Sequence, residues 1–232
     1  MLRFTCDAFK NFLVPFRGSA AHSMLDQPLK FFVVFFVVVE PVSLIPLFSK
    51  LTQGANVAYK RRMAAKAVVV AAGILLLFAL GGAAFLELMG ISLEAFRIFG
   101  GLLLFLLALE MVFARESGTR TSTDEQAESR RRADISVFPL AFPFIAGPGA
   151  LATILLWFGP IHIAGQPLLF LGLSVGVALV LAISLVMMWL ADPLMRIIGV
   201  TGANVAGRLL GVILGALAVQ FVIDGLRNTF GS

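Results

Sequence analysis

The chain has 232 residues, of which 59% are hydrophobic and only 13% are charged, with a mean hydropathy of +0.99 and a formal net charge of +5. Soluble domains carry about 25% charged residues, so this composition excludes a soluble enzyme, a disordered regulator and a disulfide-stapled secreted module. One cysteine and two histidines supply few metal ligands, and the phenylalanines lie in apolar runs rather than among basic residues. We therefore expect no metal site, no nucleic-acid partner and a fold built in the lipid bilayer.

Long apolar runs recur along the whole chain. A helix needs about 20 apolar residues to cross the hydrocarbon core of a membrane. Six segments meet or approach this length, which predicts an all-α, polytopic membrane protein with six transmembrane helices. The predicted spans cover approximately residues 29–51, 63–89, 91–113, 135–158, 168–191 and 205–225.

The second half of the chain repeats features of the first. Arg97-Ile-Phe-Gly100 in the third span resembles Arg208-Leu-Leu-Gly211 in the sixth, and each follows a similar segment, Gly90-Ile-Ser or Gly199-Val-Thr. The first and fourth spans are both interrupted by prolines. Two halves of three spans each would be inverted relative to one another, because three is odd. Inverted repeats with broken helices in matching positions are typical of secondary transporters.

The proline breaks predict where a site would lie. Proline removes an amide donor and clashes with the preceding helical turn, which leaves backbone groups without partners. Hydrocarbon tolerates such groups only where protein buries them or a polar cavity faces them. Freed carbonyls and helix ends can then bind a cation or a zwitterion, and glycines allow close approach. The alternative is a pair of simple kinks covered by neighbouring helices. The predicted substrate- or ion-binding residues are Glu40, Pro41, Ser43, Pro46, Pro143, Gly147, Pro148, Gly149 and Thr153.

Charged residues within the spans are the strongest functional signal. Glu40 follows an apolar run deep in the first span, where a carboxylate costs several kcal/mol unless it is paired, hydrated or protonated. We expect it to carry a proton or contact a cation, the alternative being a structural hydrogen bond to the broken backbone. Arg97 and Arg208 match between the halves. They could pair with Glu40 or with a substrate carboxylate, or could anchor helix ends.

Two segments lie outside the spans. Residues 1–28 alternate basic and apolar residues, which predicts an interfacial amphipathic tail, although Met24 offers an alternative start. Residues 114–134 are rich in charge and predict a polar cytoplasmic loop. The chain is thus expected to divide into the tail (1–28), a first three-helix repeat (29–113), the loop (114–134) and a second three-helix repeat (135–232). The loops after the first, third and fifth spans carry most of the Lys and Arg outside the tail, which places both termini in the periplasm.

Enzymatic and ATP-driven chemistry find little support. Gly172-Leu-Ser-Val-Gly176 matches the G-x-S-x-G nucleophile pattern, but it lies in an apolar helix and no span contains a histidine to act as base. The G-x-x-x-x-G-K-[ST] phosphate-binding pattern does not occur. We expect neither catalysis nor a cofactor.

Several segments resemble a known family. Glu40-Pro-Val-Ser-Leu-Ile-Pro-Leu-Phe48, Gly90-Ile-Ser-Leu-Glu-Ala-Phe-Arg-Ile-Phe-Gly-Gly101, Phe138-Pro-Leu-Ala-Phe-Pro-Phe-Ile-Ala-Gly-Pro-Gly149 and Ala218-Val-Gln-Phe-Val-Ile-Asp-Gly225 are similar to those of the MarC-like integral membrane proteins. The resemblance implies six spans in the bacterial inner membrane and, from a few members, transport of small neutral amino acids such as alanine and glycine. The family more often has Asp or Asn where this chain has Glu40.

Together, these features predict a secondary carrier. The solute would be small and neutral, such as an amino acid, and its movement would be coupled to protons or sodium. Its partners would be the bilayer and the solute, with a homo-oligomer left open. The competing hypothesis is a non-transport membrane scaffold or assembly protein, which would have little use for a buried Glu40.

Overall fold

The computed structural model describes residues 26–113, 134–161 and 165–230, and this part of the chain is all-helical. The predicted tail (1–28) and polar loop (114–134) lie almost wholly outside the described residues. The elements in chain order are α2 (Asp26–Val39), α3 (Leu44–Leu51), α4 (Val57–Leu88), α5 (Leu93–Phe113), η1 (Ser136–Ile145), α7 (Pro148–Phe158), α8 (Pro167–Trp189) and α9 (Ala191–Phe230).

The described chain contains four to six candidate membrane spans. Helices α4, α5 and α8 and the Asn204–Phe230 part of α9 are each long and apolar enough to cross a membrane. The pairs α2–α3 and η1–α7 reach that length only together, and they are bent by 41° and 55° respectively. The predicted second, third, fifth and sixth spans are therefore confirmed as helices of sufficient length. The first and fourth are interrupted, as their prolines predict.

The interruption of the fourth segment is longer than its prolines and glycines predict. The predicted break covers residues 143–149, whereas Phe138 and Phe142 already have extended backbone within η1. Each precedes a proline across a cis peptide bond, and proline disfavours helical conformation in the residue before it. The turns of η1 are also wide, since the Ala146 amide donates to the Ala141 carbonyl, 2.8 Å away. Nearly the whole segment before α7 is therefore irregular.

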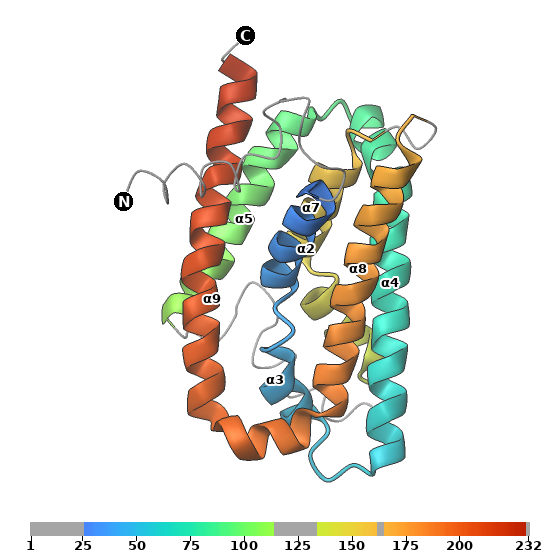
Figure 1. Ribbon diagram of the computed structural model, residues 1–232, viewed down its shortest axis with the longest axis vertical. Helices are drawn as coiled ribbons and strands as arrows, with labels where there is room; N and C mark the ends of the chain where they lie inside the picture. Colours follow the sequence, from blue (N-terminus) through green and yellow to red (C-terminus); the bar gives the residue numbers. More distant parts are fainter. Residues whose placement is uncertain (1–25, 114–133, 162–164, 231–232) are drawn as a thin grey trace.

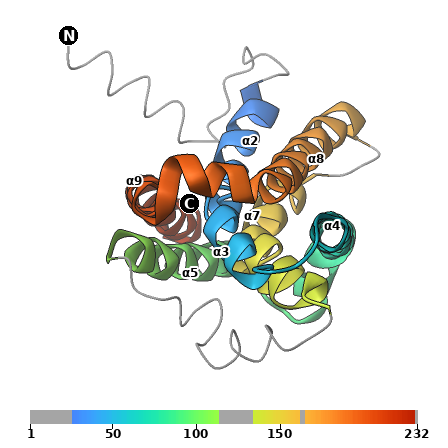
Figure 2. The same ribbon diagram turned by 90° about the horizontal axis from the view of Figure 1, so that it is seen from below.

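Helix α9 is longer than the predicted sixth span and is kinked. It begins at Ala191, and its only non-helical residue is Gly199, with a φ of 65°. Gly90, which opens the matching motif before α5, has a φ of 69°. Such positive φ values favour glycine, so both copies of the motif place glycine where the backbone requires it. Residues 191–198, before the kink, cross the lower end of the bundle (Figures 1 and 2).

The two bent pairs form the centre of the molecule. Seen along the bundle, α3 and α7 lie between α5 and α9 on one side and α4 and α8 on the other (Figure 2). Helix α3 packs against α8 and α9, and α7 packs against α4 and α5. In the amino-terminal half of α2, the ring of Phe31 contacts Phe35, Trp157 and Phe158. Helices α3 and α7 are therefore flanked by the continuous helices, whereas Val137 and Phe142 of η1 remain exposed.

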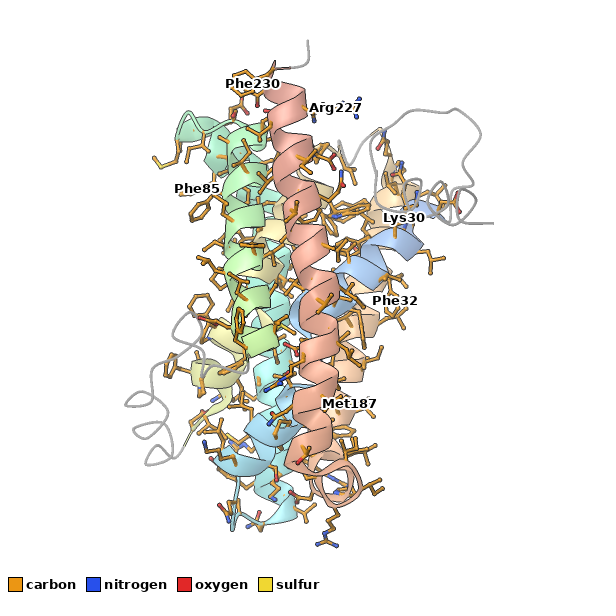
Figure 3. The ribbon with its side chains drawn as sticks, turned by 90° about the vertical axis from the view of Figure 1, so that its left-hand side faces the viewer. Lys30, Phe32, Phe85, Met187, Arg227 and Phe230 are labelled. Carbon is orange, nitrogen blue, oxygen red and sulfur yellow. The ribbon has the colours of Figure 1, made fainter. Side chains whose placement is uncertain are left out.

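The outer surface of the bundle is apolar. Leu77 is 68% exposed and Phe85 is 58% exposed on α4, and Phe230 of α9 is 80% exposed. Phe85 and Phe230 extend away from the bundle (Figure 3). Exposed apolar patches of soluble proteins rarely exceed a few hundred Å², whereas here apolar side chains line all four long helices. Such a surface is matched to lipid.

Polar contacts tie the helices together at the lower end of Figure 1, where α3 ends and α4 and α9 begin. Lys60 forms an ion pair with Asp192 at 2.6 Å, and Ser49 donates to the same carboxylate at 3.4 Å. Lys66 forms an ion pair with Asp134, just before η1. Hydrogen bonds from Lys66 and then from Ser136 lower the pKa of the Asp134 carboxyl to about 2.

Helices α5 and α9 approach one another through glycines. A Cβ added to Gly101 would lie 2.9 Å from the Ala218 carbonyl oxygen, and one added to Gly211 would lie 3.2 Å from that of Ala108. Gly225 approaches α5 in the same way. Small residues allow helices in membranes to pack backbone against backbone. This contact joins the two halves of the chain along much of the bundle.

Candidate functional site

The first break lies at the end of α2 and contains an unusual backbone conformation. Glu40 has a φ of 53°, the only positive φ of a non-glycine residue in the described part of the chain. Its amide donates to the Phe36 carbonyl at 2.9 Å, and its carbonyl accepts from the Ser43 amide at 3.1 Å. Pro41 has no amide hydrogen, so its nitrogen needs no hydrogen-bond acceptor in this turn. The local hydrogen bonds therefore close the break without a continuous helix.

The Glu40 side chain is buried. It is 1% exposed, and the Ser43 hydroxyl donates to its Oε1 atom at 2.5 Å. Gly207 of α9 lies beside this hydrogen bond, because an added Cβ there would stand 3.4 Å from Oε1 and 4.0 Å from the Ser43 hydroxyl oxygen. The carboxyl group therefore occupies a space between the first break and a glycine of the other half of the chain.

The second break is built from glycine and proline and carries no charge. Gly147 precedes α7, and a Cβ there would lie only 2.2 Å from the Pro143 carbonyl oxygen, so no larger residue fits. Pro148 occupies the first turn of α7, a position that lacks a helical partner for its nitrogen in any case. No side chain caps this end of α7. Thr153 is fully buried, and its hydroxyl donates to the Gly149 carbonyl at 2.9 Å.

The two breaks are neighbours. A Cβ added to Gly149 would lie 3.4 Å from Cγ1 of Val38, which is two residues before Glu40, and 2.6 Å from Cδ2 of Leu104 on α5. Beside this contact lies a cavity of about 50 Å³. It is lined by Val38, Leu103, Leu107, Pro143, Phe144, Gly147, Pro148, Gly149 and Ala150.

The structure separates the predicted site residues into two groups. Pro143, Gly147, Pro148 and Gly149 line the cavity. Glu40 and Ser43 lie together on the side of the first break that faces α9. The remaining predicted residues lie nearby: Pro41 is buried beside Glu40, Pro46 is half-buried in the first turn of α3, and Thr153 is one turn into α7.

The two matched arginines have different surroundings. Arg97 is buried in α5, and the nearby negative charges acting on it are Asp224 of α9 and Glu94 of its own helix. Asp224 also accepts a hydrogen bond from Gln220 at 2.8 Å. Arg208 follows Gly207 on α9 and is exposed. Arg97 thus belongs to a polar group between α5 and α9.

Two parts of this site are not predicted by the sequence. Gly207 looks like one member of a small-residue packing ridge on α9, yet in space it borders the Glu40 carboxyl. Leu103 and Leu107 look like ordinary lipid-span residues, yet they form one wall of the cavity. Their spacing of four residues places them on one helical face, but nothing in the sequence shows what that face meets. Within the described ranges, no group of three or more His, Cys, Asp or Glu side chains is placed to hold a metal ion.

The fold, the apolar surface and the broken central helices define a polytopic, all-helical integral membrane protein. The family model described as MarC family integral membrane protein matches residues 25–230, so the chain belongs to the MarC family. It is 32% identical to the UPF0056 membrane protein YhcE of Escherichia coli (strain K12), covering 90% of this chain and 96% of that protein. It is 33% identical to the UPF0056 membrane protein YvbG of Bacillus subtilis (strain 168), covering 86% and 93%.

A relative also occurs in the archaea. The UPF0056 membrane protein MJ0972 of Methanocaldococcus jannaschii is 32% identical, covering 87% of each chain. No solved structure matches. The family assignment confirms the resemblance drawn from the sequence motifs.

Proposed function

We propose that this protein is a secondary carrier of a small neutral solute, such as an amino acid, coupled to protons or sodium. The observation that carries the proposal is the burial of Glu40, 1% exposed, at a break in a central helix and next to a second break. A carboxyl group placed at that depth costs several kcal/mol unless it is paired, hydrated or protonated, and such groups mark ion and substrate pathways. A scaffold gains nothing from it.

The packing supports an inverted repeat. In such a repeat, α2, α3, α4 and α5 of the first half correspond to η1, α7, α8 and α9 of the second. The contact of α2 with α8 then corresponds to that of η1 with α4, and the contact of α3 with α9 corresponds to that of α7 with α5. All four contacts occur, and the contacts of α5 with α9 and of α4 with α8 each join two corresponding helices. We therefore assign residues 29–113 and 135–232 to two halves related by a pseudo-twofold axis in the membrane plane.

The broken helices supply the groups that a zwitterion would need. Helix α7 begins without a side-chain cap, so its first amides and its positive dipole end are available to a carboxylate. Glu40 lies at the neighbouring break and would contact the coupling cation or carry the proton. This division follows the pattern of carriers in which half-helix ends receive the substrate near the middle of the membrane.

Charge at the ends of the bundle supports an orientation. The starts of α4 and α9 and the end of α3 lie at one end, and they contain Lys50, Lys60, Arg61, Arg62 and Arg196. Lys30 and Arg227 lie toward the other end (Figure 3). Because cytoplasmic loops carry the excess of Lys and Arg, we assign the first end to the cytoplasm of a bacterial inner membrane and both termini to the periplasm.

The test is uptake by purified protein in proteoliposomes. Labelled glycine, alanine, serine and larger neutral amino acids would be offered with and without imposed proton and sodium gradients. We expect uptake of at least one small member that depends on one gradient. Absence of flux in folded protein would support the scaffold alternative.

A substitution separates coupling from solute binding. Glu40→Gln keeps the shape of the side chain but removes its charge and proton, so gradient-driven uptake should fall by at least about tenfold. Solute exchange without a gradient should persist, because exchange needs no net ion movement. Glu87→Gln, which changes an exposed glutamate on α4, is the matched control and should leave both unchanged. Full gradient-driven uptake by Glu40→Gln would exclude the coupling role.

A further inference from the structure

The cavity beside the second break has the size and lining of a side-chain pocket. It has a volume of about 50 Å³, and its walls come from α5, from the end of α2 and from the η1–α7 break. All nine lining residues are apolar or glycine. Polar side chains line no part of it, so its walls favour an aliphatic group over a polar one.

We propose that this cavity receives the aliphatic side chain of the transported solute and sets an upper limit of about two carbons on its size. A dry cavity of about 150 Å³ lined by aliphatic residues holds a benzene ring of six carbons, so a third of that volume holds roughly two. Glycine and alanine would fit, 2-aminobutyrate would fill the cavity, and valine and leucine would not enter. The inference rests on the proposed carrier function.

The position of the cavity favours a solute over a lipid chain. It adjoins Gly147, Pro148 and Gly149, where α7 begins, and Val38, two residues from Glu40. A zwitterion whose ends lie at these two breaks would direct a short side chain into the space between them.

Two residues control the volume from opposite walls. Leu103 is half-buried on α5, and its truncation would remove about three carbons from one wall with little loss of core packing. Ala150 is 3% exposed in the first turn of α7, and a larger side chain there would project into the same space. The two changes should therefore shift size selectivity in opposite directions.

The experiment measures both binding and flux for a series of increasing side-chain length. Glycine, alanine, 2-aminobutyrate, valine and leucine would be tested by the shift in thermal unfolding temperature of detergent-solubilised protein and by uptake in proteoliposomes. In the natural protein we expect the apparent affinity for leucine to be at least tenfold lower than that for 2-aminobutyrate in both measurements. Leu103→Ala should allow binding and uptake of valine and leucine. Ala150→Val should weaken binding and uptake of alanine but leave those of glycine unchanged.

The matched control is Leu106→Ala, a substitution on the same helix at a residue that is 49% exposed on the outer surface. It should leave the series unchanged. Size-dependent binding without flux would support the pocket and overturn the carrier function. Flux with the same size series in all variants would support the carrier and overturn the pocket. Neither binding nor flux by folded protein would overturn both, and displacement by short alkyl chains instead of amino acids would identify a lipid site and overturn the solute pocket.

Discussion

The breaks in the first and fourth apolar segments of the chain differ in chemistry. The first carries an acid, Glu40, in a strained turn that faces Gly207. The second carries no charge, depends on Gly147 and Pro148, and lines a cavity. If the halves arose as a repeat, their breaks have diverged, so that the first holds an acidic side chain and the second forms the wall of an apolar cavity. Substitutions at the two breaks should therefore fail in different ways.

The largest effect is expected at the second break. Gly147→Ala would place a methyl group 2.2 Å from the Pro143 carbonyl oxygen, which belongs to the backbone and cannot rotate away. We expect a loss of about 3 kcal/mol in stability, at the upper end for overpacked sites. The measurement is thermal unfolding of the detergent-solubilised protein followed by tryptophan fluorescence.

The control for this prediction is Gly73→Ala on α4, where nothing lies within 4 Å of the added Cβ. It should stabilise the helix by up to about 1 kcal/mol. Equal unfolding temperatures for the two variants would show that the second break is not limited by shape.

At the first break, the expected effect on stability is smaller. Ser43→Ala removes the hydroxyl that donates to Glu40 Oε1, and a hydrogen bond of this kind contributes about 1 kcal/mol. Ser174→Ala is the control, because its hydroxyl donates only to the Phe170 carbonyl of its own helix. The difference in unfolding temperature between the two variants measures the contribution of the acid. Identical temperatures would mean that Ser43 does not stabilise Glu40.

The smallest effect concerns the outer ends of the broken pairs. The second pair is held to α4 by Asp134 and Lys66, and hydrogen bonds from Lys66 and Ser136 lower the pKa of Asp134 to about 2 from the ordinary 3.8. A lowered pKa stabilises the fold above pH 3.8, and this contribution is lost as the pH falls through about 2. Because the pair is exposed, Asp134→Asn should cost less than about 1 kcal/mol at pH 7.

The pH dependence provides the check. The gap in unfolding temperature between the natural protein and Asp134→Asn should narrow as the pH falls from 5 toward 2. The gap between the natural protein and Glu87→Gln, which alters an exposed glutamate at the far end of α4, should not follow that course. A gap for Asp134→Asn that widens at low pH would contradict the assignment.

Much of the fold could be predicted from local sequence. The lengths of the apolar runs predict the long helices, and the prolines predict the interruptions at Pro41, Pro46, Pro143 and Pro148. Both features are local, because each changes the backbone only within a few residues of itself. The extent of the irregular η1 was underestimated, since Pro139 also forces the preceding residue out of helical conformation.

The site could be predicted only in part. Glu40 was identifiable because a carboxylate in an apolar run is exceptional. Its neighbour Gly207 and the cavity wall at Leu103 were not, because they come from helices distant in the chain and look like ordinary membrane-span residues. Which helix faces meet depends on packing across the whole bundle, and no local pattern records it.

The glycine contact between α5 and α9 has a mechanical consequence. The nearest side-chain atom to an added Cβ is Cγ2 of Val222 at Gly101 and Cβ of Met111 at Gly211, both at 2.8 Å, so residues of each helix fit into the notches left by the glycines of the other. A lengthwise shift of one helix would move these side chains out of their notches, so the contact resists shear. Bulky substitutions at these glycines would therefore act as wedges that push α5 and α9 apart.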